Sequence, residues 1–259
     1  MKITGQVEQI FSHAVALDQS GGLRNTIYAN KREIFILNFD HTVLVRFRLK
    51  STENPFQNPV SFRANDYDSN EFYEEDGKII FISEKDGFQR KKSSGKAEYE
   101  PEQVKEIFYK FIDEQPRQTV VLKKEIISLL DTDLSHIEFS GKKGEPLKMI
   151  QRNIYSGAVI EVQQKGGGYF DEGLDGDFGP IGIKTGDFQA LFMFQDVLQF
   201  EFPYDEGDDY IVIRSIEKDK RDMVAVVACC LYDEIIQLRT VKKDIIKSSK
   251  NKPIVRTKK

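Results

Sequence analysis

Alternation of apolar and polar residues is the dominant pattern along this chain. Leu198, Phe200 and Phe202 alternate with Gln199 and Glu201. A period of two residues is typical of a strand that buries one face. Further apolar runs that predict strands occupy residues 34–37, 43–49, 78–83, 120–122, 158–162, 210–213 and 223–230. The pattern therefore predicts a protein made largely of antiparallel sheet.

Helical spacing of apolar residues occurs in only a few segments. The clearest is residues 101–115, where Pro101 stands at a first helical position and one apolar stripe runs from Val104 to Ile112. The other candidate helices cover residues 7–15, 66–75, 122–130 and 185–192. The segment 66–75 contains aromatic residues without a regular period, so its helix rests mainly on its place in the order of elements.

That order repeats along the chain. A strand, a helix and three strands are expected in residues 1–49, 57–95, 118–163 and 181–232. Spacing of this regularity indicates repeated supersecondary units. The fold class is therefore α+β, with repeated βαβββ units that pair into two similar domains. The predicted divisions are a first domain at 1–95, a connector with a helix at 96–118, a second domain at 119–239 and a basic flexible tail at 240–259.

Composition and charge exclude several classes of function. The 259 residues carry a net charge of −4 and include 19 Phe and 10 Tyr, which favours a folded protein with large buried side chains. No apolar run reaches the roughly 18 residues of a membrane helix, and no hydrophobic signal core is expected at the amino terminus. Cys229 and Cys230 are adjacent, and a bridge between neighbours in a strand would be strained, so we expect an intracellular, reducing location.

No motif for catalysis, metal or cofactor binding is evident. Three histidines and two adjacent cysteines offer no zinc-binding spacing, and no G-x-S-x-G sequence is present. The glycine-rich acidic stretch at 166–179 does not match the calcium-binding loop of an EF-hand. We therefore expect a protein without enzymatic activity, cofactor or metal.

The sequence resembles the sliding DNA clamp family in the order of its elements and in two stretches. Residues 1–17 (MKITGQVEQIFSHAVAL) and 25–49 (NTIYANKREIFILNFDHTVLVRFRL) are similar to the first strand, helix and strand pair of those clamps. The unit at 181–232 is similar to a clamp's final repeat. The resemblance implies antiparallel sheets on the outside, helices on the inner face, and a two-domain chain that closes as a homotrimer. It also implies a DNA polymerase processivity factor, and the departures from cellular patterns suggest a phage or viral source.

The resemblance further implies loose, sequence-independent contacts to the phosphates of duplex DNA. The residues expected to make them are Lys123, Lys124, Lys184, Arg24, Lys91 and Lys92. The alternative for each is an ordinary solvated side chain. Two features depart from the family's pattern. The 66–75 segment is acidic, and a helix is expected at 101–115 where those clamps have an extended connector.

Partner binding is implied in the same way. Clamps capture short peptides of a DNA polymerase and of the clamp loader in a hydrophobic pocket, to which Phe39, His41, Leu44, Leu231 and Tyr232 would contribute. The alternative is that Phe39 and Leu44 belong to the core. Two other functions stay open. One is an adaptor or scaffold protein of clamp or other β-rich fold that does not encircle DNA. The other is an unrelated β-rich enzyme, although no residue in the sequence indicates a catalytic site.

Overall fold

The computed structural model describes most of the chain up to residue 229. The described residues are 1–3, 5–14, 25–49, 55–67, 69–76, 78–95, 97–112, 117–153, 156–163, 174, 176–204, 210–216 and 222–229. The predicted tail at 240–259 lies outside them.

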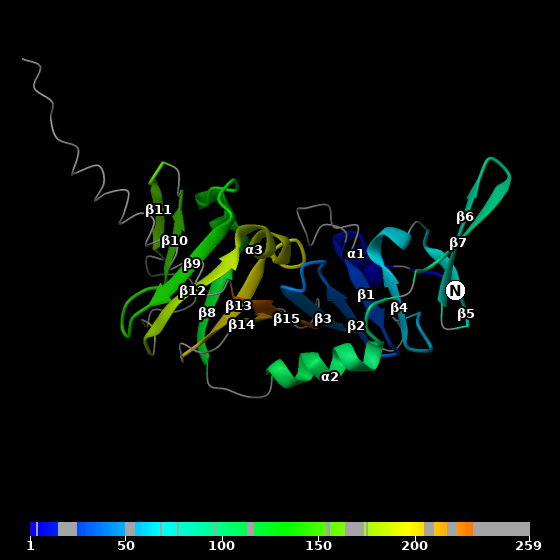
Figure 1. The fold of residues 1–259 in the computed structure, drawn as a ribbon, viewed down its shortest axis with the longest axis horizontal. Coiled ribbons are helices and arrows are strands. Elements are labelled where there is room, and N and C mark those ends of the chain that lie inside the picture. The colour runs from blue at the N-terminus through cyan, green and yellow to red at the C-terminus, as the bar shows by residue number, and fades with distance from the viewer. Residues whose placement is uncertain are drawn as a thin grey trace, which may run out of the picture.

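The first half of the chain contains two units of the same order (Figure 1). A bridge between Lys2 and Glu71 precedes the first helix, and the elements that follow are α1 (Gly5–Ala14), β1 (Thr26–Ala29), β2 (Glu33–Leu37), β3 (Val43–Arg48), β4 (Val60–Arg63), the 3₁₀-helix η1 (Ala64–Asp66), β5 (Glu71–Glu75), β6 (Lys78–Lys85) and β7 (Phe88–Ser93). Then α2 (Pro101–Ile112) follows.

The second half repeats that order twice more. Its elements are β8 (Arg117–Lys123), the 3₁₀-helix η2 (Lys124–Leu129), β9 (His136–Gly141), β10 (Lys148–Arg152), β11 (Val159–Gln163), β12 (Phe178–Lys184), α3 (Thr185–Leu191), β13 (Val197–Pro203), β14 (Tyr210–Ser215) and β15 (Asp222–Ala228). Each unit is therefore a strand or bridge, a helix of either kind, and three strands. The strands predicted from apolar runs are all confirmed.

One of the expected helices is wrong, and another is a 3₁₀-helix rather than an α-helix. The 3₁₀-helix η1 ends at Asp66, and residues 71–75 form strand β5, in which Phe72 is buried while its neighbours Glu71 and Tyr73 are not. The apolar stripe at 122–130 combines Leu122, which belongs to β8, with the 3₁₀-helix η2. At 122–130 a strand side chain contributed to an apparent helical period, whereas the helix at 66–75 was expected mainly from the repeated order of elements. The helices predicted near 7–15, 101–115 and 185–192 are confirmed as α1, α2 and α3.

Neighbouring units are interlocked, because the first strand of one unit pairs with a strand of the other. Strand β4 opens the second unit but pairs with β1 of the first, and β8 and β12 are exchanged between the third and fourth units in the same way. The result is one eight-stranded sheet in the order β4-β1-β2-β3-β15-β14-β13-β8, together with the sheets β11-β10-β9-β12 and β5-β6-β7. The two halves of the chain meet in the eight-stranded sheet, where β3 runs antiparallel to β15 from Val43↔Val227 to Arg48↔Asp222.

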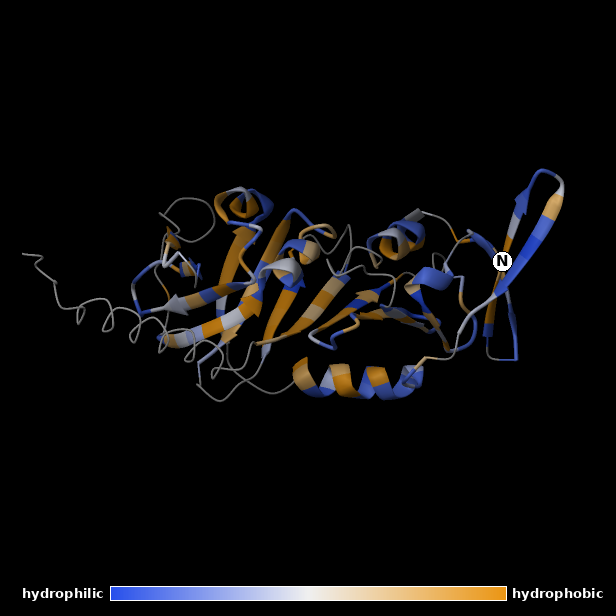
Figure 2. Cartoon of the chain, turned by 45° about the horizontal axis from the view of Figure 1, so that its top comes forward, coloured by the Kyte–Doolittle hydropathy of each residue, from blue (hydrophilic) through white to orange (hydrophobic). Residues whose placement is uncertain are grey.

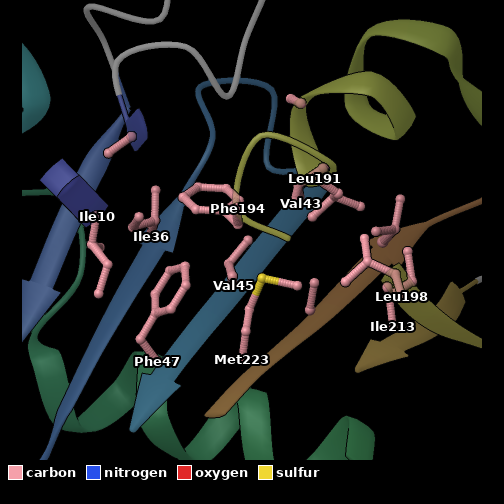
Figure 3. Close-up of a cluster of buried hydrophobic side chains, with 14 of the residues drawn as sticks. Ile10, Ile36, Val43, Val45, Phe47, Leu191, Phe194, Leu198, Ile213 and Met223 are labelled. Carbon is pink, nitrogen blue, oxygen red and sulfur yellow. The ribbon is translucent and has the colours of Figure 1, made fainter. Parts of the chain in front are cut away.

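Both faces of this seam are covered. On β3, Val43, Val45 and Phe47 join the large core beneath α1 and α3, while Leu44 joins a second cluster beneath α2. Figure 3 shows the first of these faces, where side chains from β2, β3 and β15 lie beside those of α1 and α3. Figure 2 shows α2 on the opposite side of the sheet from the other two α-helices. The side of the sheet that carries α1 and α3 is called the helix side below.

Helix α2 is held by apolar packing and by a buried ionic cluster. Val104 and Phe108 pack on Tyr28, Phe35 and neighbouring side chains of the sheet. The Arg46 guanidinium on β3 is 2.8 Å from the Asp222 carboxylate on β15 and lies under the Phe108 ring. The Tyr109 hydroxyl of α2 donates to Glu33, which also faces Arg46 at 3.8 Å. The helix thus spans strands of both halves.

We predict that Phe108→Ala destabilises the protein by about 3–5 kcal/mol, because a fully buried ring is replaced by a cavity. The adjacent Ile107→Ala is the control, since Ile107 is 44% exposed, and its cost should stay below about 1 kcal/mol. Urea unfolding followed by far-UV circular dichroism measures both free energies. Equal effects of the two substitutions would contradict the packing of α2 described above.

Candidate functional site

The turn between β2 and β3 is fixed by the side chain of Asn38. Its Oδ1 accepts hydrogen bonds from the backbone N–H groups of Thr42 (2.8 Å) and Val43 (2.9 Å), and its Nδ2 donates to Thr42 Oγ1. His41 adopts φ = +58°, the left-handed region, which closes the turn. The turn therefore presents Phe39 and His41 in one arrangement, with Phe39 48% exposed.

This turn also contacts the second half of the chain. Thr42 Oγ1 donates to the buried carboxylate of Asp187 in α3 at 2.8 Å, and Lys184 Nζ lies 2.6 Å from Asp40. A hollow of about 330 Å³ lies beside these pairs, between the turn, the segment before β9 and the start of α3. The turn is therefore positioned from both halves of the chain.

A larger cavity opens next to the same turn. Its volume is about 490 Å³, and Phe39 and His41 line it together with Thr26, Asn38, Arg63, Ala97 and Glu98. His41 Nε2 lies 3.4 Å from Glu98, and its ring meets Tyr99 edge-on. The cavity combines an exposed aromatic ring with charges of both signs, which suits a peptide more than an apolar ligand.

The other residues predicted for partner binding have different positions. Leu44 is not among the residues that line the cavity; it lies beneath α2, where it pairs with Val226 across the seam. Burial raises the pKa of Tyr28, in the same cluster, to about 12. Leu231 and Tyr232 lie outside the described residues.

The predicted DNA-binding lysines of the second half lie at the ends of elements. Lys123 and Lys124 are exposed at the junction of β8 and η2, and Lys184 immediately precedes α3. Lys124 faces Asp196 at 3.4 Å, and Lys184 faces Asp40. Exposed ion pairs of this kind contribute about 0–1 kcal/mol, so a phosphate can replace either carboxylate at little cost.

The predicted lysines of the first half lie on strand β7, on opposite faces. Lys91 Nζ stands over the Tyr73 ring, and Lys92 Nζ donates to the Asn65 carbonyl of η1 and lies 3.6 Å from Asp66. Arg24 lies outside the described residues. Neither α1 nor α3 contains a lysine or arginine. Among the described residues, the predicted cations therefore lie on strands and at the first residue of η2, not on the α-helices.

Sequence patterns missed Thr26, Arg63, Ala97 and Glu98 as cavity residues. Thr26 and Arg63 meet because β1 pairs with β4, and Glu98 reaches them from the segment before α2. No local pattern signals these long-range pairings. Among the described residues there is no group of three His, Cys, Asp or Glu side chains placed to hold a metal ion. None of the helices in the described part of the chain has the length and apolar character needed to cross a membrane.

The fold is similar to that of DNA sliding clamps. No protein family or curated protein sequence matches the chain, so the likeness is one of structure. The DNA polymerase III subunit beta from Pseudomonas aeruginosa is 12% identical with a TM-score of 0.55, over 86% of this chain and 64% of that one. The Helicobacter pylori beta clamp bound to a DNA ligase peptide is 11% identical with a TM-score of 0.57, over 86% and 62%.

A chain of the PCNA2–PCNA3 complex from Sulfolobus tokodaii is 11% identical with a TM-score of 0.51, over 85% of this chain and 94% of that one. This chain thus spans less than two thirds of the two bacterial clamps but matches nearly the whole Sulfolobus tokodaii chain. The resemblance expected from the sequence is confirmed at the level of the fold.

We predict that Thr42→Val destabilises the protein by about 1–3 kcal/mol, because the buried Asp187 carboxylate loses a hydrogen bond that an isosteric valine cannot supply. Thr42→Ser keeps the hydroxyl and should cost less than about 1 kcal/mol. Chemical denaturation measures both. If serine is as harmful as valine, the methyl group rather than the hydrogen bond fixes the turn.

Proposed function

We propose that this protein is a sliding clamp-like processivity factor, without enzymatic activity, that acts inside the cell, encircles duplex DNA and tethers replication proteins. The observation that carries the proposal is the β3–β15 seam, a continuous antiparallel joint between two halves built from the same ordered units. In the proposed ring the sheets lie outside, and α1, α3, η1 and η2 face the DNA.

The seam supplies a template for ring closure. Strand β11 has the place in its unit that β3 has in the first, and β7 has the place of β15. Both β7 and β11 are edge strands of their sheets. A joint between β11 of one copy and β7 of the next would repeat the seam between copies.

Repetition of one head-to-tail joint closes a ring when the rotation between neighbouring copies is a whole fraction of a full turn. The near-complete match to the Sulfolobus tokodaii chain supports a chain of similar extent, and we propose a homotrimer.

We propose a register for this joint by comparing the hairpins. Asn38 N–H donates to the Val43 carbonyl, and Asn153 N–H donates to the Ala158 carbonyl, so Glu161 corresponds to Arg46. On the other edge we match the core residue Phe81, opposite Lys92, to the core residue Ile213, opposite Ala225. Because Arg46 pairs with Val224, Glu161 would lie opposite Lys91 of the next copy, with opposite charges in register.

Exposed cations support the contact with duplex DNA. Lys123 ends β8, Lys124 begins η2, and Lys184 ends β12 next to α3. Lys124 pairs with the exposed carboxylate of Asp196, and Lys184 pairs with that of Asp40. Contacts of this kind bind phosphates weakly and without sequence preference, as a sliding protein requires.

The cavity beside Phe39 and His41 supports the capture of partner peptides. It offers an aromatic ring, a guanidinium and a carboxylate within one hollow of about 490 Å³. We propose that peptides of a DNA polymerase and of a clamp loader bind there. The Helicobacter pylori clamp of similar fold was solved with a DNA ligase peptide, which supports peptide binding by this class of fold.

The absence of Lys and Arg from α1 and α3 favours a second candidate, an adaptor of clamp fold that does not encircle DNA. Oligomeric state and topology distinguish the two functions. Light scattering should give a mass near three chains, and protein loaded on closed circular DNA with its loader should be released when the circle is cut. A strict monomer at high concentration, or equal retention on circular and linear DNA, would favour the adaptor.

We predict that Lys91→Glu weakens self-association by about 1 kcal/mol per joint, roughly fivefold, because like charges then face each other across the strands. Glu161→Lys should weaken it similarly, and the double exchange should restore it. Sedimentation equilibrium measures the constants. If the double variant associates no better than the single ones, the proposed register is wrong.

We predict that combining Lys123→Glu, Lys124→Glu and Lys184→Glu lowers retention on circular DNA at low salt at least tenfold, because three phosphate contacts become repulsive. The control is Lys142→Glu with Lys143→Glu, an exposed pair in the β9–β10 turn. If both variants and the parent protein are retained equally on circular DNA, Lys123, Lys124 and Lys184 do not contact DNA.

A further inference from the structure

The β6–β7 hairpin extends beyond the rest of its sheet. Strand β5 pairs with β6 only between Lys78 and Ile82, so the part from Ser83 to Arg90 is paired only with itself. Asp86 and Gly87, with φ of 52° and 80°, form the two-residue turn at its end. Figure 1 shows the hairpin projecting from the body of the molecule.

The two faces of this hairpin differ in charge. Phe81 points into the core, and Lys92 opposite it reaches η1, so alternate positions outward from this pair lie on the helix side. These positions are Ser83, Lys85, Phe88 and Arg90. They include two cations and no carboxylate. The carboxylate of Glu84 belongs to the opposite face, with Ile82, Gln89 and Lys91.

Phe88 is the most exposed large apolar residue among those described, at 79%. Its cross-strand partner is Lys85, and Arg90 follows two residues along the same face. Figure 2 shows the hairpin as largely hydrophilic, with a hydrophobic segment near its outer end. An aromatic ring held between two cations on a projecting strand pair matches the chemistry that binds unpaired nucleotides, where a base stacks on the ring and phosphates meet the cations.

We propose that Lys85, Phe88 and Arg90 form a binding site for single-stranded DNA. The inference builds on the proposed function, since this face of the hairpin lies on the helix side, and it adds a contact with the unpaired strand next to the duplex. In the proposed joint Arg90 would lie opposite Val162 of the next copy, at the border of the joint, whereas Lys85 and Phe88 lie beyond the end of β11. The exposed ring selects single strands because only an unpaired base offers its face for stacking. A duplex would use the cations alone. An acidic protein would likewise use the cations and leave the ring uncovered.

The test measures binding of the full-length protein to a fluorescent twelve-nucleotide oligothymidine by anisotropy at low salt. Phe88→Ala should weaken binding about five- to 100-fold, the usual effect of removing one stacking side chain. Phe88→Trp should restore it. Phe111→Ala is the matched control, since Phe111 is a 36% exposed phenylalanine on α2, outside the hairpin, and should leave the affinity unchanged.

The cations are tested through salt dependence. Lys85→Gln and Arg90→Gln should each reduce the slope of log K against log salt by about 0.7, the value for one phosphate contact on a single strand. Arg90→Lys should retain the slope. Lys78→Gln, on the opposite face of the same hairpin, is the control and should leave the slope unchanged.

The inference is overturned if the parent protein does not bind the oligonucleotide, or if Phe88→Ala and Phe111→Ala bind it equally. A twelve-nucleotide linear strand cannot report encirclement, so this result is independent of the ring. Release from cut circular DNA tests the ring separately, and loss of oligonucleotide binding with normal retention on circles would overturn only the single-strand site.

Discussion

The antiparallel joint between β3 and β15 is the constraint on which the rest of the structure depends. It merges strands of both halves into one eight-stranded sheet, so the residues at the joint are buried on both faces. Helices α1 and α3 cover one face and α2 covers the other. A sheet covered twice leaves little freedom for the halves to rotate against each other. The relative orientation of the helices on one side is thereby fixed, as the proposed contact with DNA requires.

The joint also explains why charge and polar side chains gather where they do. Arg46 is buried between Glu33 and Asp222 at the place where β2, β3 and β15 lie together, and Tyr109 of α2 completes the cluster. Buried ion pairs contribute little net stability but penalise any other arrangement strongly. The cluster therefore favours one seating of α2 across the joint. On the opposite side, Thr42 and Asp187 give the turn that carries Phe39 and His41 a similar single position.

Much of this architecture could be predicted from the sequence, and the failures have physical causes. Strands with alternating apolar residues, such as β13, and the amphipathic helix α2 could be predicted because one face of each is buried. The helix expected at 66–75 was wrong because local spacing does not reveal which neighbour a residue such as Phe72 pairs with. Phe39 and His41 were indicated through family resemblance and do line one cavity, whereas Arg63 and Glu98 join it only through the pairing of distant segments. The faces of the β6–β7 hairpin became distinguishable only once the register was known.

The exchange of first strands between units has a consequence for how the chain can be divided. A break inside either pair of units separates a strand from the sheet it completes, as β4 completes the sheet of β1 and β8 that of β13. A break between α2 and β8 leaves every described strand intact. The two polypeptides produced there would each keep their own exchanged strands and would present β3 and β15 as matching borders. Such a molecule is suited to assembly from separate parts, and gene fission or fusion at this point would preserve its shape.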